Sequence, residues 1–565
     1  MPTDPPASLP APAPAPPAAT PFQVAGVVVA VVALLIGVPV FLQTPPWCDL
    51  TLYQLAARNL LTGGVLYRDI FDTNLPGFVW ALTAVQAVFG ESVIAVRAID
   101  LAVVGGIAAV LARHVGDAGG TPATRAWFAA GVALYYPFTS EFSHAQRDVW
   151  MLLPALAAFR LRLAGRAPFA EGLLWGCAVW VKPHVVVPAF AVWLVSAVAR
   201  RPGRPVGTLP LLAGGSLLGL VGVAGLVASG AWPGFVEVFT VWNPEYTAFT
   251  FEELPQRVTI TFNYFPPWSL VHVVTIPAAV VHLIQARRAN PVARPRAFLA
   301  ALYLGWLGQA FVLQRALEYV HVPETLLAIA VLGAYRVPVG LVGGLALAAQ
   351  GVLFAAGLGT VAAPSAYFPL EIPRIANPAI LAAWPDCFGP NTPDLRDRLR
   401  EYPVHCVPTW TDLAAVEAYL RAVEPPLRDG ELLTFHDSPH PLYLSMHLRP
   451  ATRYLHFSPV LSIRSQQPRV AAEVRAAAPR YVVSDTMRST WVRGVERDPD
   501  AAGGQAGLPR WFPLSQRGRF PWDQPIVFRS GRYFVHRIDR PIGDVDVPSW
   551  YDLGTLGPGE PTARP

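Results

Sequence analysis

Charge is scarce in this sequence. Only 14% of its 565 residues are charged, whereas 53% are hydrophobic and the mean hydropathy is +0.38. A soluble protein carries more charge because its whole surface faces water, so many segments here are predicted to lie where no water solvates a charge. The net charge of +5 is therefore no sign of a nucleic-acid partner. Most arginines stand in short loops between apolar runs, where they set membrane topology.

Cysteine is scarce as well. The chain has four, Cys48, Cys177, Cys387 and Cys406, and none forms a CxxC pair, so a zinc site has no support. Cys387 and Cys406 fall in a part of the chain that we expect on the oxidising side of a membrane. A disulfide closing a loop of about 20 residues and two separate buried thiols are equally good interpretations of this pair.

The beginning of the chain has a single charged side chain, Asp4, and lacks the features of a cleaved signal. Residues 1–21 are rich in proline and alanine and have no apolar periodicity, which is typical of a disordered tail, here predicted to be cytoplasmic. Residues 22–43 are an uninterrupted apolar run with neither a basic n-region nor a short h-region. They are predicted to be a retained transmembrane helix.

Arginine clusters predict the topology of the helices that follow. The loops 160–166, 199–205 and 285–296 carry these clusters and the loops between them do not, so the basic set is expected on the cytoplasmic side. With 93–112 as one span, the apolar segment 76–89 does not cross, and at about 14 residues it suits an interfacial or re-entrant helix. The total is about eleven helices, N-terminus inside and C-terminus outside. The other spans are expected near 124–138, 148–164, 168–181, 183–199, 208–229, 267–285, 297–313, 322–336 and 338–360.

The composition changes at about residue 363. Proline, aspartate, arginine and asparagine rise to the frequencies of soluble proteins, which predicts an extracytoplasmic globular domain over 363–565 behind a membrane domain over 22–362. Its patterns predict an α/β fold, with a hairpin that turns at Ser530 and Gly531. The expected strands are 431–437, 480–486 and 525–538, and the expected helices are 411–424 and 468–479.

Three carboxylates mark the first predicted extracytoplasmic loop, residues 44–92. Asp49 follows Pro45 and Pro46, and Asp69 and Asp72 follow a glycine pair. Carboxylates at the lip of a bilayer are costly to desolvate and are normally kept for a ligand, a proton or a metal. A general base with a second carboxylate to orient it would activate an acceptor hydroxyl or amine. Alternatively, Asp49 is the N-cap of a helix that begins near Leu50, and an N-cap can do both.

Cationic and polar groups recur at outer helix ends on the same face. A single lysine or arginine there usually snorkels to the interface, but several converging on a face that carries acids suit a phosphate leaving group. No compact set of metal ligands accompanies them, so a divalent metal is possible but not supported. The groups are Arg147 and Asp148 in HAQRD, Lys182 and His184 in VKPH, and Arg315, Tyr319 and His321 in QRALEYVH.

These motifs together resemble a known family. The run from Asp49 and Tyr53 to Pro76-Gly77, followed by the QRD, KPH and EYVH motifs, resembles polytopic membrane glycosyltransferases of the C-type fold (GT-C), in particular the protein O-mannosyltransferase and lipid A aminoarabinose transferase group. In that family an acidic residue of the first outer loop, often Asp-Glu, is proposed to activate the acceptor. Here Asp49 is followed by Leu50, which leaves Asp72 or Asp69 as its partner.

The resemblance implies a function and a set of roles. The donor would be a polyprenyl-phosphate-linked sugar, the acceptor a glycan, lipid or protein, and the reaction an inverting transfer in one displacement. The protein would belong to the inner (plasma) membrane and serve the cell envelope. The lipid phosphate would be held by Arg147, Lys182 and His321, with Arg68, Asp148, His184, Arg315 and Tyr319 as further candidates.

Two further stretches have alternative interpretations. The aromatic loop 231–266 is either a surface segment that gates the lipid or stacks on sugar, or a packing lid without substrate contact. HDSPHPLYL (436–444) places two histidines and an aspartate together, which fits a metal site, but a strand end, a proline turn and a helix start explain it more simply.

Two other classes of protein compete with a transferase. A transporter or flippase of lipid-linked glycans also has many helices, but it often shows internal repeats and charges at mid-membrane depth, which are not clear here. A receptor or scaffold would need only one or two anchoring helices.

Overall fold

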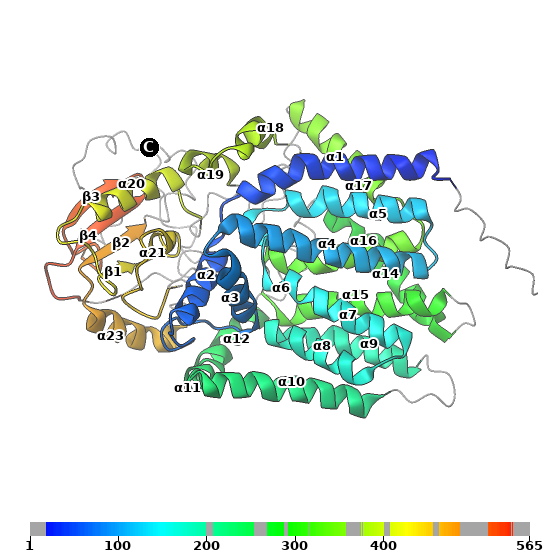
Figure 1. The fold of residues 1–565 in the computed structure, drawn as a ribbon, viewed down its shortest axis with the longest axis horizontal. Helices are drawn as coiled ribbons and strands as arrows, with labels where there is room; N and C mark the ends of the chain where they lie inside the picture. Colours follow the sequence, from blue (N-terminus) through cyan, green and yellow to red (C-terminus); the bar gives the residue numbers. More distant parts are fainter. Residues whose placement is uncertain are drawn as a thin grey trace, which may run out of the picture.

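The computed structural model describes residues 18–198, 207–252, 268–287, 292–315, 317–356, 375, 377–400, 407–455, 463–485, 518–543 and 545. Figure 1 shows two parts. On the right, long helices lie side by side along the horizontal direction, and on the left the sheet and the last helices gather. The domain boundary that the sequence predicts, at 362–363, lies outside the described residues.

The long helices fall where the sequence predicts spans. Four of those described, α1, α4, α10 and α15, are long and apolar enough to cross a membrane by length and composition. Apolar side chains of α1 and α10 face outward, as in Leu35 (63% exposed) and Leu209 (81%), whereas every residue of α16 is buried. The helices are α1 (Pro21–Gln43), α4 (Val93–Asp117), α5 (Pro122–Tyr135), α7 (Leu152–Ala164), α8 (Pro168–Val181), α9 (Val186–Val198), α10 (Thr208–Ala228), α14 (Val271–Ile284), α15 (Ala293–Leu313), α16 (Val322–Ala334) and α17 (Val339–Ala355).

Two shorter helices lie between the bundle and the C-terminal part. They are α2 (Cys48–Leu61) and α3 (Gly77–Phe89), which pack on each other (Figure 1). Pro45 and Pro46 separate α2 from α1, because proline removes a backbone donor and disfavours a helical residue before it. At 13 residues α3 is short, as predicted for 76–89.

The C-terminal part has the predicted α/β pattern. Its four described strands have the order β1-β2-β4-β3, with β1 parallel to β2 and the other neighbours antiparallel. The hairpin predicted within 525–538 is confirmed as β3 and β4, but Ser530 still belongs to β3 and pairs with Tyr533, so the turn is at Gly531 and Arg532, one residue later than predicted. The elements are α18 (Pro378–Ala383), α19 (Pro393–Leu399), α20 (Trp410–Arg421), β1 (Leu432–Thr434), α21 (Pro441–Ser445), α23 (Gln467–Ala477), β2 (Tyr481–Asp485), β3 (Ile526–Ser530) and β4 (Tyr533–Arg537).

The two parts share one core. A single cluster of buried apolar side chains contains residues of α2 and the acidic loop, such as Tyr53 and Phe71, together with Leu433 and Val482 of the sheet. Polar bonds cross the same junction: Arg58 of α2 donates to the carbonyl oxygens of Tyr443 (2.8 Å) and Leu448 (2.6 Å). The C-terminal part is therefore packed onto the first loop.

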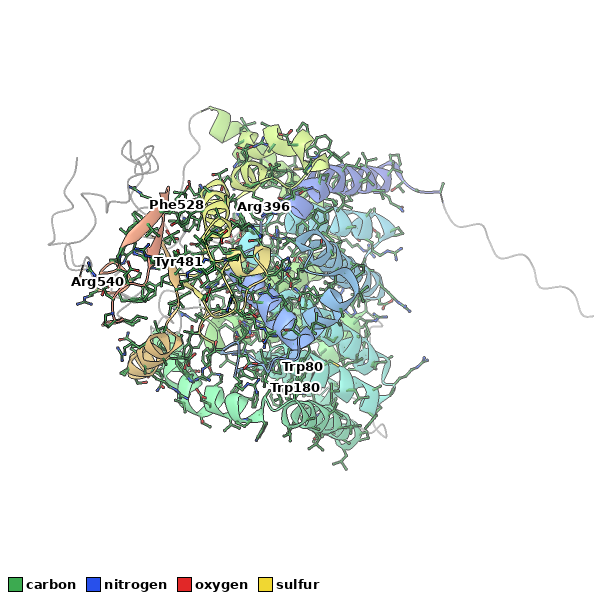
Figure 2. The ribbon with its side chains drawn as sticks, turned by 60° about the vertical axis from the view of Figure 1, so that its left-hand side comes forward. Trp80, Trp180, Arg396, Tyr481, Phe528 and Arg540 are labelled. Carbon is green, nitrogen blue, oxygen red and sulfur yellow. The ribbon has the colours of Figure 1, made fainter. Side chains whose placement is uncertain are left out.

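The aromatic side chains of the C-terminal sheet and of the bundle lie in separate places. Figure 2 shows Tyr481 and Phe528 by the sheet, and Trp80 and Trp180 next to each other at the junction of α3 and α8. The Trp80 and Trp180 ring centroids are 5.4 Å apart.

Cys387 is buried near α18, and the predicted disulfide partner, Cys406, lies outside the described residues.

Candidate active site

Asp49 lies in the first turn of α2 and does not cap it. The helix begins at Cys48 with Trp47 as N-cap, earlier than the start near Leu50 that the sequence predicts, so the N-cap interpretation of Asp49 is wrong. A carboxylate inside the first turn is still stabilised by the helix dipole. Asp49 is half-buried and interacts electrostatically with Tyr53 and Lys182.

Asp72 is the second carboxylate of the site. It is 4% exposed, and its Oδ1 accepts hydrogen bonds from the backbone N–H (3.1 Å) and Nδ2 (2.6 Å) of Asn74. Asp72 interacts electrostatically with Tyr53, as Asp49 does, and with Arg147. The structure therefore brings both carboxylates to one tyrosine.

Asp69 and Arg68 lie apart from this group. They pair with each other at the surface, with Arg68 Nε 2.6 Å from Asp69 Oδ1, and Asp69 also accepts from the Val65 N–H at 2.6 Å. The hydrogen bond from Arg68 holds the pKa of Asp69 below its usual range. Among the interactions that the structure records for these two side chains, none involves Asp49, Asp72 or Arg147.

Arg147 is the cation at the centre of the site. It begins the short helix α6 (Arg147–Trp150) and is 6% exposed, and its guanidinium carbon lies 5.5 Å from the centre of the Tyr53 ring. Among the described residues no carboxylate forms an ion pair with it, and its Nε has no hydrogen-bond partner. A buried guanidinium in this state is a strong donor for an anion, because an unpaired buried charge is costly.

Lys182 forms a buried ion pair with Asp148. Its Nζ donates to both carboxylate oxygens of Asp148 (2.8 and 2.7 Å) and also to Gln314 Oε1. The two charged side chains are 8% and 0% exposed. Lys182 therefore fixes Asp148 and α6 against the C-terminal end of α8, and a phosphate would reach the Arg147 guanidinium with less rearrangement.

Two buried tyrosines line the same space. Lys182 Nζ lies 5.7 Å from the centre of the Tyr319 ring, and Tyr319 interacts electrostatically with Asp49 and Arg147. Burial raises the pKa values of Tyr53 and Tyr319 well above their ordinary value. Both hydroxyls are therefore neutral at physiological pH and available as hydrogen-bond donors to an anion.

The other predicted phosphate ligands surround this group. His321 ends the turn η7 (Glu318–His321), and its Nδ1 lies 2.5 Å from Glu324 Oε1 in α16. His184 interacts electrostatically with Lys182. The Arg315 guanidinium lies 5.6 Å from the ring centre of Tyr246, which belongs to α12 (Asn243–Glu252).

The aromatic segment covers the acidic loop. In its described part, α11 (Trp232–Glu237) is followed by a π-helical turn, Val238–Trp242, and by α12. The Trp242 ring lies 4.6 Å from that of Phe71, and Asn243 Nδ2 donates to the Thr73 carbonyl oxygen at 3.2 Å. Residues 253–266 of the predicted loop lie outside the described residues.

Sequence reasoning missed two charged side chains of α4 that hold this site. Asp100 accepts from the Tyr136 hydroxyl (2.7 Å), the Ala145 N–H (2.8 Å) and Trp150 Nε1 (2.8 Å), and Arg97 donates to the Pro45 carbonyl oxygen at 2.7 Å. The available signal was a charge inside the apolar run 93–112, since charges within a span are expensive and usually functional.

No metal centre accompanies these groups in the part of the chain that the structure describes: no three histidine, cysteine, aspartate or glutamate side chains there are arranged to hold an ion. In the HDSPHP stretch, His436 Nδ1 accepts from the Asp485 N–H (2.9 Å) and His440 Nε2 lies 2.7 Å from the Leu455 carbonyl oxygen. The helix start expected after it is α21, which begins at Pro441.

No protein-family model matches the chain, and neither does any curated protein. Among solved structures it is similar to apo ArnT from Cupriavidus metallidurans, with 14% identity over 91% of this chain and 97% of that chain and a TM-score of 0.49. It is also similar to ArnT from the same organism bound to undecaprenyl phosphate, with 14% identity over 93% of this chain and 100% of that chain and a TM-score of 0.47. A third similar structure is the Archaeoglobus fulgidus oligosaccharyltransferase in complex with Zn and sulfate, with 14% identity over 81% of this chain and 68% of that chain and a TM-score of 0.37. These are membrane glycosyltransferases of the C-type, the group that the motifs resemble. At these identities and TM-scores they assign no role to any residue, so function is inferred from the site itself.

Proposed function

We propose that this chain transfers a sugar from a polyprenyl-phosphate-linked donor to an extracytoplasmic acceptor with inversion at the anomeric carbon. The observation that carries the proposal is the buried Arg147 guanidinium, which has no ion-pair partner among the described residues and shares the neighbour Tyr53 with the carboxylates of Asp49 and Asp72. An anionic group on a lipid chain matches both the cation and the bundle.

In this proposal Arg147 binds the donor phosphate. As the bond between the anomeric carbon and the phosphate oxygen breaks, its electron pair stays on the phosphate, so negative charge grows where the guanidinium lies. The neutral hydroxyls of Tyr53 and Tyr319 donate hydrogen bonds to the same oxygens. Lys182 acts through Asp148 by keeping α6, and with it Arg147, in place.

Asp49 is the proposed general base. It takes the proton of the acceptor hydroxyl or amine, whose lone pair forms the new bond to the anomeric carbon on the face opposite the phosphate. The products are a glycosylated acceptor and polyprenyl phosphate, and the proton stays on Asp49 until it passes to water. Asp72 is already hydrogen-bonded to Asn74, so we assign it the orienting role.

The test is transfer of labelled sugar from a polyprenyl-phosphate donor in membranes that contain this chain. Asp49→Asn is expected to lower the rate by about 10²–10⁴-fold and Arg147→Gln by about 10²–10³-fold, with normal amounts of folded protein. Asp69→Asn and Arg68→Gln are matched controls, because these side chains pair at the surface. If Asp49→Asn transfers sugar at the wild-type rate, Asp49 is not the general base. A donor panel that gives neither transfer nor binding would overturn the whole proposal.

A further inference from the structure

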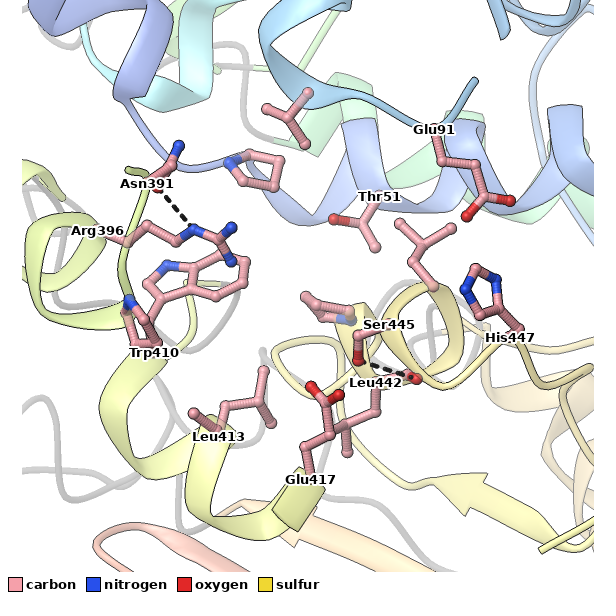
Figure 3. A pocket seen from close by; sticks show the side chains of 16 residues that line it. Thr51, Glu91, Asn391, Arg396, Trp410, Leu413, Glu417, Leu442, Ser445 and His447 are labelled. Atoms are coloured by element: carbon pink, nitrogen blue, oxygen red, sulfur yellow. Dashed lines mark hydrogen bonds between the residues drawn. The ribbon is translucent and has the colours of Figure 1, made fainter. Parts of the chain in front are cut away.

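A pocket of about 340 Å³ lies where the C-terminal part meets α2. Its walls come from distant parts of the chain: Pro46 and Thr51 at the start of α2, Glu91 before α4, Arg396 of α19, and side chains of α20 and α21 (Figure 3). The volume is within the range of about 300–1,000 Å³ that small-molecule sites have. None of the groups proposed above to hold the donor phosphate lines it.

The pocket adjoins the proposed base through α2. Asp49 lies between Pro46 and Thr51 along the chain, and both of these line the pocket. The first turn of α2 thus separates the pocket from the Arg147 side, where Asp49 interacts with Tyr53 and Lys182. A molecule held in the pocket would be next to the helix that carries the base.

One side of the pocket presents hydrogen-bond donors beside an aromatic ring. The Arg396 guanidinium carbon lies 4.8 Å from the Trp410 ring centre, and its Nε donates to Asn391 Oδ1 at 2.8 Å, with the rest of the group directed into the pocket (Figure 3). Trp410 lines the pocket and is 5% exposed, so this side offers guanidinium N–H groups beside an aromatic surface.

Carboxylates stand on the opposite side. Glu417 of α20 and Glu91 both direct their carboxylates into the pocket (Figure 3). Each is held from outside it, Glu417 by Arg421 at 2.7 Å and Glu91 by Arg58 at 3.6 Å. These two ion pairs compensate the carboxylates, which remain hydrogen-bond acceptors at the pocket wall.

Much of the remaining lining is apolar, and Thr51, Ser445 and His447 add polar groups to it. Leu413, Leu442 and Leu444 form the apolar part together with Pro393 and Pro441. A sugar ring matches this pattern, because its C–H face is apolar whereas its hydroxyls both donate to carboxylates and accept from guanidinium N–H groups.

We propose that this pocket binds a neutral saccharide unit of the acceptor, which makes the acceptor a glycan. That this sugar belongs to the acceptor rests on the proposed function. That the ligand is a neutral sugar rests on the pocket alone. Arg396 and Glu417 fix the hydroxyls of the sugar, and the apolar part of the lining supports its ring.

The test uses the purified full chain and a panel of methyl glycosides of common neutral sugars, with binding followed by saturation-transfer NMR. We expect at least one glycoside to bind. Ala414→Trp fills the pocket and should weaken that binding by about tenfold or more, whereas Ala418→Trp, one turn further along α20 on an exposed position, should not. Arg396→Gln should also weaken it by about tenfold, and Arg398→Gln, an exposed neighbour paired with Asp386, should not.

Binding of polyprenyl phosphate to the same preparation separates the two proposals. If no glycoside binds while polyprenyl phosphate binds and Arg147→Gln abolishes that binding, the pocket proposal fails alone. If Ala414→Trp and Ala418→Trp bind the glycoside equally well, the saccharide lies elsewhere and the pocket proposal is overturned. If glycoside binding depends on Ala414 and Arg396 but no donor binds, the pocket proposal holds and the proposed function fails.

Discussion

The pair of Lys182 and Asp148 is the most demanding contact of the site, because both charges are buried. Removing one partner of a buried ion pair typically costs about 3–5 kcal/mol, since the other charge is left without compensation. We therefore expect Lys182→Met to lower the free energy of unfolding by about this amount. The double variant Lys182→Met, Asp148→Asn should recover part of it, as measured by thermal unfolding in detergent. Equal stability of the single and double variants would contradict the pair's role.

His436 gives the C-terminal part a dependence on pH. Burial lowers its pKa from 6.5 to about 3, so the unfolded state binds a proton below pH 6.5 that the folded state does not bind until about pH 3. Stability should therefore fall as pH decreases from 6.5 towards 3, by up to about 1.4 kcal/mol per pH unit. His436→Asn keeps an acceptor for the Asp485 N–H and should flatten this slope in limited proteolysis between pH 7 and 4. An unchanged slope would assign the effect to other groups.

At the scale of elements, the N-terminal end of α4 supports both halves of the site. Arg97 holds the backbone before α2, and Asp100, one turn later, holds the segment before α6 through three hydrogen bonds. One helix therefore fixes the distance between the carboxylate side and the cation side. This arrangement explains why two charges are kept in an otherwise apolar helix.

Asp100→Asn replaces one acceptor oxygen by a donor and should displace the loop before Arg147. We expect a loss of about 1–3 kcal/mol of stability. The KM for the lipid-linked donor should rise more than that for the acceptor, because Arg147 is proposed to bind the phosphate. Asp117→Asn, at the other end of α4 and paired with Arg160, is the control. An equal rise in KM for the donor and the acceptor would indicate that Asp100 supports the fold in general and not the donor site.

The sequence predicts elements better than contacts. The apolar runs locate the long helices, and the alternation in 525–538 locates the β3–β4 hairpin, because length and period are local properties. The start of α2 was placed too late, which made Asp49 a cap. The bonds of Lys182 to Asp148 and Gln314 join residues 34 and 132 positions apart, and no local pattern encodes such pairs.

At the scale of the whole molecule, Arg453 joins three parts. Its Nη2 lies 3.0 Å from Glu237 of α11, its Nη1 donates to the Tyr67 carbonyl oxygen at 3.2 Å, and its Nε lies 3.3 Å from Glu473 of α23. It connects the acidic loop, the aromatic segment and the C-terminal part. The aromatic segment is in this way held as a cover over the first loop.

Arg453→Met should therefore loosen this cover. We expect faster hydrogen exchange in residues 65–74 and 232–248 and a lower rate of transfer, because the loop that carries Asp72 loses its support. Arg449→Met removes only an exposed pair with Asp429 and should change neither. Equal exchange in the two variants would show that the apolar contacts alone hold the segment.

The shared core joins segments that are synthesised at very different times. Arg58 of α2 donates to the carbonyl oxygen of Tyr443, which is synthesised 385 residues later. At about 5–20 residues per second, this is a delay of roughly 20 to 80 s. The first loop is thus synthesised long before the segment that packs on it, so a nascent or truncated chain has its carboxylates without these contacts. Under the proposed function, such a chain should transfer no sugar until its synthesis is complete.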